Sequence, residues 1–154
     1  MYVVPAFAGL GAPYWDANAK GSITGITLDI GKNEIIKATV EALAYQTKDV
    51  INVMLEDSGS KMVALKVDGG ASANNYLMQF QSDILNVDVD RPKMLEVTAL
   101  GAAFLAGIKA GFWTSDAIEK VRKREALFTP KMEEHTRIKK YMGWKEAVER
   151  TKSN

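Results

Sequence analysis

The sequence predicts an α/β fold, and three observations carry the prediction. After residue 60 the segments alternate as strand, helix, strand and helix, which implies a parallel pair of strands joined by a helical crossover. The apolar side chains change from alternating spacing to helical spacing between the predicted strands and helices. The chain has 154 residues, 47% hydrophobic and 25% charged, which suits one packed globular domain. We therefore expect residues 1–154 to form a single domain.

Two short strands are expected in the first 31 residues. The first is followed by an ordered loop, because Gly9, Gly11 and Pro13 interrupt any helix or long strand. The second lies within Gly21–Leu28, where polar and apolar side chains alternate.

A long helix is predicted next. Apolar positions recur at helical spacing at Ile36, Val40, Leu43, Thr47, Val50 and Met54, and Ala44 and Ile51 widen the stripe that we expect to be buried. Asn33 is the expected N-cap, with Glu34 at the positive end of the helix dipole. Gly59 is expected to end the helix.

The second half of the chain predicts the alternating part of the fold. Val63–Val67 is a brief strand, and a helix with one apolar face follows it, formed by Leu77, Phe80 and Ile84. The next strand, Val87–Asp90, has Asp88 and Asp90 on its expected exposed face and is closed by Arg91-Pro92. Thr98 is expected to cap an alanine-rich helix that ends at Gly111. The charged tail predicts a short helix and a longer one around Thr136–Arg150 that buries Ile138, Tyr141 and Val148.

Composition and charge exclude several classes of function. The formal net charge is +1, which argues against a nucleic-acid binder. The absence of cysteine and the presence of one histidine, His135, exclude a disulfide scaffold and a multi-histidine zinc site. The N-terminus lacks a basic region, and no apolar run reaches the roughly 20 residues that span a bilayer. We expect a soluble, cytoplasmic protein with neither nucleic acid nor membrane as partner, and His135 at its surface.

The segment Asp68-Gly69-Gly70-Ala71-Ser72-Ala73-Asn74-Asn75 carries the strongest signal for a ligand site. Glycines without a Cβ let a flat ligand lie against the backbone, and a helix N-terminus offers unpaired N–H groups to an anion. Asn74 and Asn75 could hydrogen-bond a ligand from the first turn. The segment lacks the Gly-Lys-Ser/Thr of a Walker loop and the spacing of a dinucleotide fingerprint. A tight strand-to-helix turn without a ligand remains the alternative interpretation.

Several stretches together resemble the C-terminal part of the FGGY carbohydrate kinases, in the superfamily of actin, hexokinase and Hsp70. They are Pro5–Asp16, Gly21–Ile26 with Ala38–Glu41, Val67–Asn75, Met78–Leu85, Glu96–Ala103 and Gly111–Trp113. The resemblance covers nearly the whole chain. The Gly-Leu-Gly-Ala-Pro loop at residues 9–13 favours the members of the family that phosphorylate glycerol over those that phosphorylate pentuloses or gluconate.

The resemblance implies a partial ribonuclease-H-like, actin-like ATPase domain with short parallel strands and packed helices. In such kinases ATP lies mainly on the C-terminal domain. Gly70 and Asn74 are therefore expected to contact the nucleotide, and Gly69 and Ala71 to shape the floor beneath its adenine and ribose.

The same resemblance implies that the catalytic parts of the enzyme lie elsewhere. The catalytic Asp and most glycerol contacts belong to an N-terminal domain that the chain does not include, and Mg²⁺ is bound mostly by parts of the parent that are absent here. We accordingly expect a fragment that is inactive by itself, from a homo-oligomeric parent, with no catalytic or metal-binding residue among these 154.

Two alternatives stay open at this point. One is a different FGGY kinase, specific for a pentulose or for gluconate. The other is a non-catalytic interaction module that kept the helices and lost the active site. The aromatic pairs Tyr14-Trp15 and Phe112-Trp113 are interpreted as anchors that pack loops onto the core, because no polar constellation accompanies them.

Overall fold

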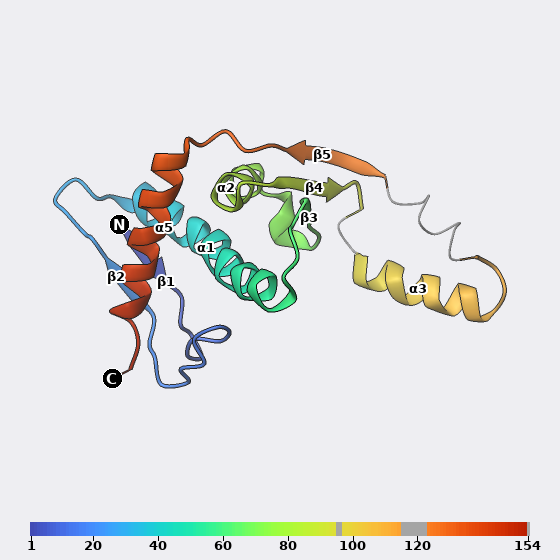
Figure 1. Ribbon diagram of the computed structural model, residues 1–154, viewed down its shortest axis with the longest axis horizontal. Coiled ribbons are helices and arrows are strands. Elements are labelled where there is room, and N and C mark those ends of the chain that lie inside the picture. Colours follow the sequence, from blue (N-terminus) through green and yellow to red (C-terminus); the bar gives the residue numbers. More distant parts are fainter. Residues whose placement is uncertain (95–96, 115–122, 154) are drawn as a thin grey trace.

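The computed structural model describes residues 1–94, 97–114 and 123–153. Figure 1 shows the long helix α1 at the centre, with the α5 helix crossing it near the two chain ends and the β3–β4–β5 sheet on its other side. The elements in chain order are β1 (Tyr2–Val4), β2 (Ser22–Thr24), α1 (Lys32–Ser58), β3 (Ala64–Lys66), the 3₁₀ helix η1 (Gly70–Ala73), α2 (Asn75–Leu85), β4 (Asp88–Pro92), α3 (Val97–Lys109), β5 (Arg124–Phe128) and α5 (Glu134–Glu149).

The predicted crossover is confirmed. Strands β3 and β4 are parallel, with Leu65 opposite Val89, and α2 joins them. Strand β5 was not predicted: it pairs antiparallel with β4 and gives the sheet order β3-β4-β5. Strands β1 and β2 form a separate antiparallel pair, as short as the glycines around them imply.

Helix α1 has the predicted length but not the predicted buried face. It begins at Lys32 with Gly31 at the N-cap, so Asn33 lies inside the first turn, and the Glu34 carboxylate accepts a hydrogen bond from the Gly31 N–H at 2.9 Å. Gly59 ends the helix in the left-handed conformation, as predicted. The predicted stripe is largely exposed at Ile36, Leu43 and Met54. Ala44 of the stripe is buried as predicted, but its buried neighbours are Ala38, Ala42 and Tyr45, because this face packs against β1 and α2.

Aromatic side chains form the centre of the core. Tyr45 of α1 stacks on Trp144 of α5 with ring centroids 5.2 Å apart and meets Phe80 of α2 edge-on at 5.3 Å. The predicted apolar face of α2 is confirmed, since Leu77, Phe80 and Ile84 are all buried. These contacts hold three helices that are distant in the sequence around one cluster.

The C-terminal tail departs from its prediction in two ways. Residues 124–128 form a strand, and the predicted short helix falls on residues 115–122, which lie outside the described residues. The longer helix is confirmed as α5, which buries Val148 and half-buries Tyr141 but leaves Ile138 49% exposed. Close approach of α5 to β1 requires a glycine, because a Cβ on Gly143 would lie 2.6 Å from Tyr2 Cζ.

Helix α3 lies apart from the other elements in Figure 1. It is described from Val97 on, so Thr98 lies in its first turn rather than before it, and its C-terminal end agrees with the prediction of Gly111. Trp113 packs against Gly107 and edge-on to Phe104, whereas Phe112 is 79% exposed and anchors nothing among the described contacts. Within the described residues, no helix is both long enough and apolar enough to cross a membrane.

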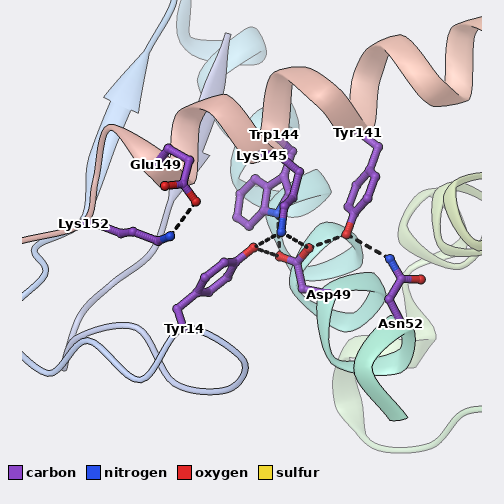
Figure 2. A network of polar contacts seen from close by, with 8 residues as sticks. All are labelled: Tyr14, Asp49, Asn52, Tyr141, Trp144, Lys145, Glu149 and Lys152. Atoms are coloured by element: carbon purple, nitrogen blue, oxygen red, sulfur yellow. Dashed lines mark hydrogen bonds and ion pairs between the residues drawn. The ribbon is translucent and has the colours of Figure 1, made fainter. Parts of the chain in front are cut away.

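A buried carboxylate joins three separate parts of the fold. Asp49 of α1, 2% exposed, accepts hydrogen bonds from Tyr14 at 2.8 Å, Tyr141 at 2.5 Å and the Trp144 indole at 2.7 Å. Lys145 adds an ion pair at 3.9 Å. Figure 2 shows these side chains converging on Asp49 from the N-terminal loop and from α5. Tyr14 is thus the anchor that the sequence predicted, whereas Trp15 is 79% exposed and is not.

This cluster predicts a loss of stability in alkali. Burial, followed by the hydrogen bond and the charge of Asp49, raises the pKa of Tyr14 and of Tyr141 above their ordinary 10.0. The folded chain therefore keeps both phenolic protons where the unfolded chain loses them, and the free energy of unfolding falls as pH rises above about 10. Urea unfolding between about pH 9 and about pH 11 is expected to show this fall, and the Tyr14→Phe/Tyr141→Phe double variant to show a shallower one. Equal slopes for the two proteins would contradict it.

Candidate nucleotide-binding loop

The candidate loop runs from the end of β3 to the start of α2. The Val67 N–H donates to the Asp90 carbonyl at 3.1 Å, which extends the parallel pairing to the edge of the loop. Gly69 then takes φ 78° and ψ 170°, a backbone conformation that is essentially restricted to glycine. The sharp turn of the chain therefore requires the first glycine of the pair for backbone reasons.

Short local hydrogen bonds shape the rest of the loop. Ser72 is buried, and its hydroxyl donates to the Gly69 carbonyl at 2.6 Å while its N–H donates to the same oxygen at 3.1 Å. The Asn74 N–H closes the 3₁₀ turn on the Ala71 carbonyl at 3.2 Å. These bonds fix the path of the backbone and use neither the Ala71 nor the Asn74 side chain.

Both asparagines use their side-chain oxygen within the fold. Asn74 is the N-cap of α2, and its Oδ1 accepts the Leu77 N–H at 3.1 Å, which leaves the amide Nδ2 as the group it can offer to a ligand. Asn75 is the first residue of α2, and its Oδ1 accepts from Arg91 Nη1 at 2.8 Å. The Asn75 Oδ1, which was expected to be able to accept a hydrogen bond from a ligand, is therefore already bonded to Arg91.

Gly70 has no local reason to be glycine. A Cβ added to it meets no heavy atom within 4 Å, and its φ lies outside the left-handed region, in contrast to Gly69. Gly70, Ala71 and Asn74 are exposed, and Gly69 is half-buried. The four predicted residues thus form one accessible backbone ridge that a planar group could approach.

An open groove of about 600 Å³ lies beside this ridge, between α1, β3 and α2. Of the four predicted residues only Ala71 lines it. The other lining side chains are largely apolar and include the α1 stripe at Leu43, Val50 and Ile51 that the sequence placed in the core. The groove and the ridge are therefore adjacent but chemically different surfaces.

Asp83, Asp16 and Asp90 each have partners within the fold. Asp83 accepts the N–H groups of Lys131 and Met132 at 2.6 and 3.2 Å, and Asp16 accepts those of Asn18 and Ala19 at 3.1 Å. Asp90 was expected on an exposed face, but it is 4% exposed and pairs with Arg124 at 3.3 Å. The prediction failed because β5, which brings Arg124 alongside, was not foreseen. His135 is exposed near the start of α5, as predicted.

No metal centre is evident within the described ranges, where no three His, Cys, Asp or Glu side chains are grouped to hold an ion.

One residue beside the loop was not predicted from the sequence to have a role there. Arg91 of β4 is 7% exposed, and it was interpreted only as the end of a strand. The available signal in the sequence was an arginine that continues the alternating strand Val87–Asp90 just before a proline.

The fold of this chain matches solved sugar-kinase structures over nearly all of its length. A Plasmodium falciparum glycerol kinase with ADP superimposes with a TM-score of 0.87 and 40% identity, covering 99% of this chain and 31% of that one. A ligand-bound xylulose kinase from Lactobacillus acidophilus gives 0.73 and 25%, covering 95% and 29%. These matches confirm the predicted actin-like ATPase fold.

Sequence relatives point in the same direction. A glycerol kinase from Caldanaerobacter subterraneus subsp. tengcongensis is 62% identical over 151 residues, which are 97% of this chain and 30% of the relative. A glycerol kinase from Fusobacterium nucleatum is 59% identical over 99% of the chain and 31% of the relative. The chain thus spans about 30% of the length of the curated relatives it matches. Residues 1–110 match the C-terminal domain of the FGGY family of carbohydrate kinases, and the chain belongs to that family.

Proposed function

We propose that this chain is the nucleotide-side part of a glycerol kinase, which transfers a phosphoryl group from ATP to glycerol and yields glycerol 3-phosphate and ADP. The observation that carries the proposal is the 62% identity to a glycerol kinase over 97% of the chain. The Gly-Leu-Gly-Ala-Pro loop at residues 9–13 supports the same substrate. A cytoplasmic, homo-oligomeric parent is part of the proposal, and its use of ATP supports the cytoplasmic location.

The proposed nucleotide contacts are Gly69, Gly70, Ala71 and Asn74. Gly70 and Ala71 offer exposed backbone against which a base or ribose could lie, and Asn74 Nδ2 offers hydrogen-bond donors. Gly69 contributes by its backbone conformation, which turns the chain and presents the next residues. The Plasmodium glycerol kinase of the same fold was solved with ADP, which supports a nucleotide as the ligand.

We assign no Mg²⁺ ligand within this chain; among the described residues, no three histidine, cysteine or acidic side chains are grouped to hold an ion. We assign no catalytic residue within this chain either. Phosphoryl transfer depends on positioning and on electrostatic stabilisation of the transferring group, and the loop supplies only nucleotide contacts toward these. Catalysis is therefore assigned to the remainder of a complete kinase.

A pentulose or gluconate kinase is less well supported. The xylulose and gluconate kinases from Lactobacillus acidophilus are each 25% identical to the chain, against 40% for the Plasmodium glycerol kinase. Initial rates of a full-length enzyme that contains this chain, with glycerol, xylulose and gluconate in turn, would separate the candidates. A preference for glycerol is expected, and no turnover of any polyol would favour a non-catalytic interaction module.

The 154-residue chain by itself is expected to release no ADP from ATP when glycerol is added, and to bind ATP only weakly. One loop without phosphate and metal contacts offers few interactions, whereas a micromolar dissociation constant requires about 8 kcal/mol. A coupled assay for ADP and calorimetry with ATP measure the two properties. Glycerol-dependent turnover at an ordinary kinase rate, or micromolar ATP affinity, would overturn the proposed division of labour.

A further inference from the structure

Arg91 makes an unusual set of contacts for a strand residue. Its Nη1 donates to the Ser72 carbonyl at 2.9 Å and to Asn75 Oδ1 at 2.8 Å. Its Nε lies 3.1 Å from the Glu125 carboxylate, and its guanidinium carbon lies 5.2 Å from the centre of the Phe128 ring. One side chain thus joins β4 and β5 to the loop that precedes α2.

The two bonds from Nη1 bracket the proposed ligand residue. Ser72 belongs to η1 and Asn75 is the first residue of α2, so Asn74 lies between the two groups that Arg91 holds. Among the described residues, the other hydrogen bonds of the loop backbone are local, apart from the Val67 N–H to the Asp90 carbonyl at its start. Arg91 is therefore a long-range tie that fixes the end of the loop relative to the sheet.

The chemistry of the tie is specific to arginine. The guanidinium side chain is 8% exposed, and burying a charge is costly unless it is paired and hydrogen-bonded, which the contacts to Glu125, Ser72 and Asn75 provide. A lysine would keep the charge, but its single ammonium cannot reproduce a planar fork that reaches both Glu125 and the loop. If the position served only to fill space in the core, an apolar side chain would be sufficient.

We propose that Arg91 is a positioning residue for nucleotide binding. By holding Ser72 and Asn75, it keeps Gly70 and Asn74 in the arrangement that accepts the nucleotide. The inference rests on the proposed function, because it assigns Arg91 to the same loop. When this tie is lost the loop samples other arrangements, and the apparent affinity falls in proportion to the fraction that remains competent.

The strand pair offers a matched control. Arg124 forms the neighbouring arginine–carboxylate pair with Asp90 across the same two strands, and its described contacts do not reach the loop. Arg91→Lys and Arg124→Lys are therefore compared in the 154-residue chain. Asn75→Ala serves as a second variant, because it removes one of the two loop acceptors and leaves Arg91 in place.

The experiment is an NMR titration with ADP that follows the amides of residues 69–75, with thermal unfolding recorded for each protein. Arg91→Lys is expected to weaken ADP affinity about three- to tenfold and to shift the loop amides before any nucleotide is added. Asn75→Ala is expected to weaken it less, and Arg124→Lys to leave it unchanged. If Arg91→Lys does not fold, a weakened affinity in Asn75→Ala decides in favour of the proposal and an unchanged one against it.

The two levels of inference fail differently. If the loop amides of the unaltered chain do not shift even at millimolar ADP, where weak binding would still be detected, the proposed nucleotide site is wrong and the role of Arg91 is overturned with it. If the unaltered chain binds ADP and Arg91→Lys binds it equally well, only the positioning role is overturned. Equal weakening by Arg91→Lys and Arg124→Lys also overturns it, since the effect would then come from the sheet as a whole.

Discussion

Replacement of Asp49 by alanine is expected to lower the free energy of unfolding by about 3–5 kcal/mol, because it leaves buried groups without their partner. Tyr14, Tyr141 and the Trp144 indole all donate to this carboxylate, and each would lose its acceptor in a site that water does not reach freely. A chain of this size has about 5–15 kcal/mol of stability, so the loss is a large share of the total. Urea unfolding followed by tryptophan fluorescence measures it.

Two further variants separate the buried network from ordinary effects in α1. Asp49→Asn keeps one acceptor oxygen and is expected to cost less than Asp49→Ala. Thr47→Ala is the matched control on the same helix, since the Thr47 hydroxyl donates only to the Leu43 carbonyl one turn earlier at 2.8 Å. A change below about 1 kcal/mol for Asp49→Ala would show that the three donors find other partners, and that the network does not hold the N-terminal loop and α5 together.

Gly70→Val is expected to reduce kcat/KM for ATP at least about tenfold in a full-length kinase that contains this chain, with the Michaelis constant for glycerol little changed. The branched side chain would occupy the space at which the proposed nucleotide meets the backbone. Its effect on folding is expected to be small, because a Cβ at Gly70 meets no heavy atom within 4 Å. Steady-state kinetics with each substrate varied in turn provide the measurement.

Two further variants sharpen this test. Ala73→Val is the control, since Ala73 is an exposed residue of the same loop that is not among the proposed nucleotide contacts. Gly69→Ala is expected to cost stability by about 1–3 kcal/mol, because φ 78° and ψ 170° suit glycine alone. An unchanged kcat/KM for ATP in Gly70→Val would mean that the loop is only a turn.

Asn74→Asp distinguishes binding from helix capping. Aspartate caps a helix as well as asparagine does, so the bond to the Leu77 N–H survives, whereas the two Nδ2 hydrogen-bond donors are replaced by a carboxylate oxygen that can only accept. The variant is expected to keep the stability of the chain and to raise the Michaelis constant for ATP severalfold. Asn74→Ala would not separate the two roles, because it removes the helix cap and the Nδ2 donors together.

Local sequence signals determined the elements and the position of the loop. The spacing in residues 32–58 and Gly59 defined a long helix and its end, because left-handed backbone is a property of a single residue. The order of strand, helix and strand from residue 64 to 92 implied the parallel pair, since parallel strands require a crossover. The motif around Gly69 and Gly70 located the candidate site, because two consecutive glycines between a strand and a helix can be recognised in the sequence itself.

Only the tertiary structure decided which surfaces meet. The buried face of α1 is the one with Ala42, Tyr45 and Asp49, since β1, α2 and α5 pack there, and periodicity cannot tell which of two usable faces finds a partner. Burial of Asp90 and Arg91 depends on β5, a strand more than 30 residues later in the chain whose charged residues carried no strand signal. The Asp49 network and the Arg91 tie join residues that are 16 to 95 positions apart. Such contacts follow from the three-dimensional path of the chain, and no local pattern specifies them.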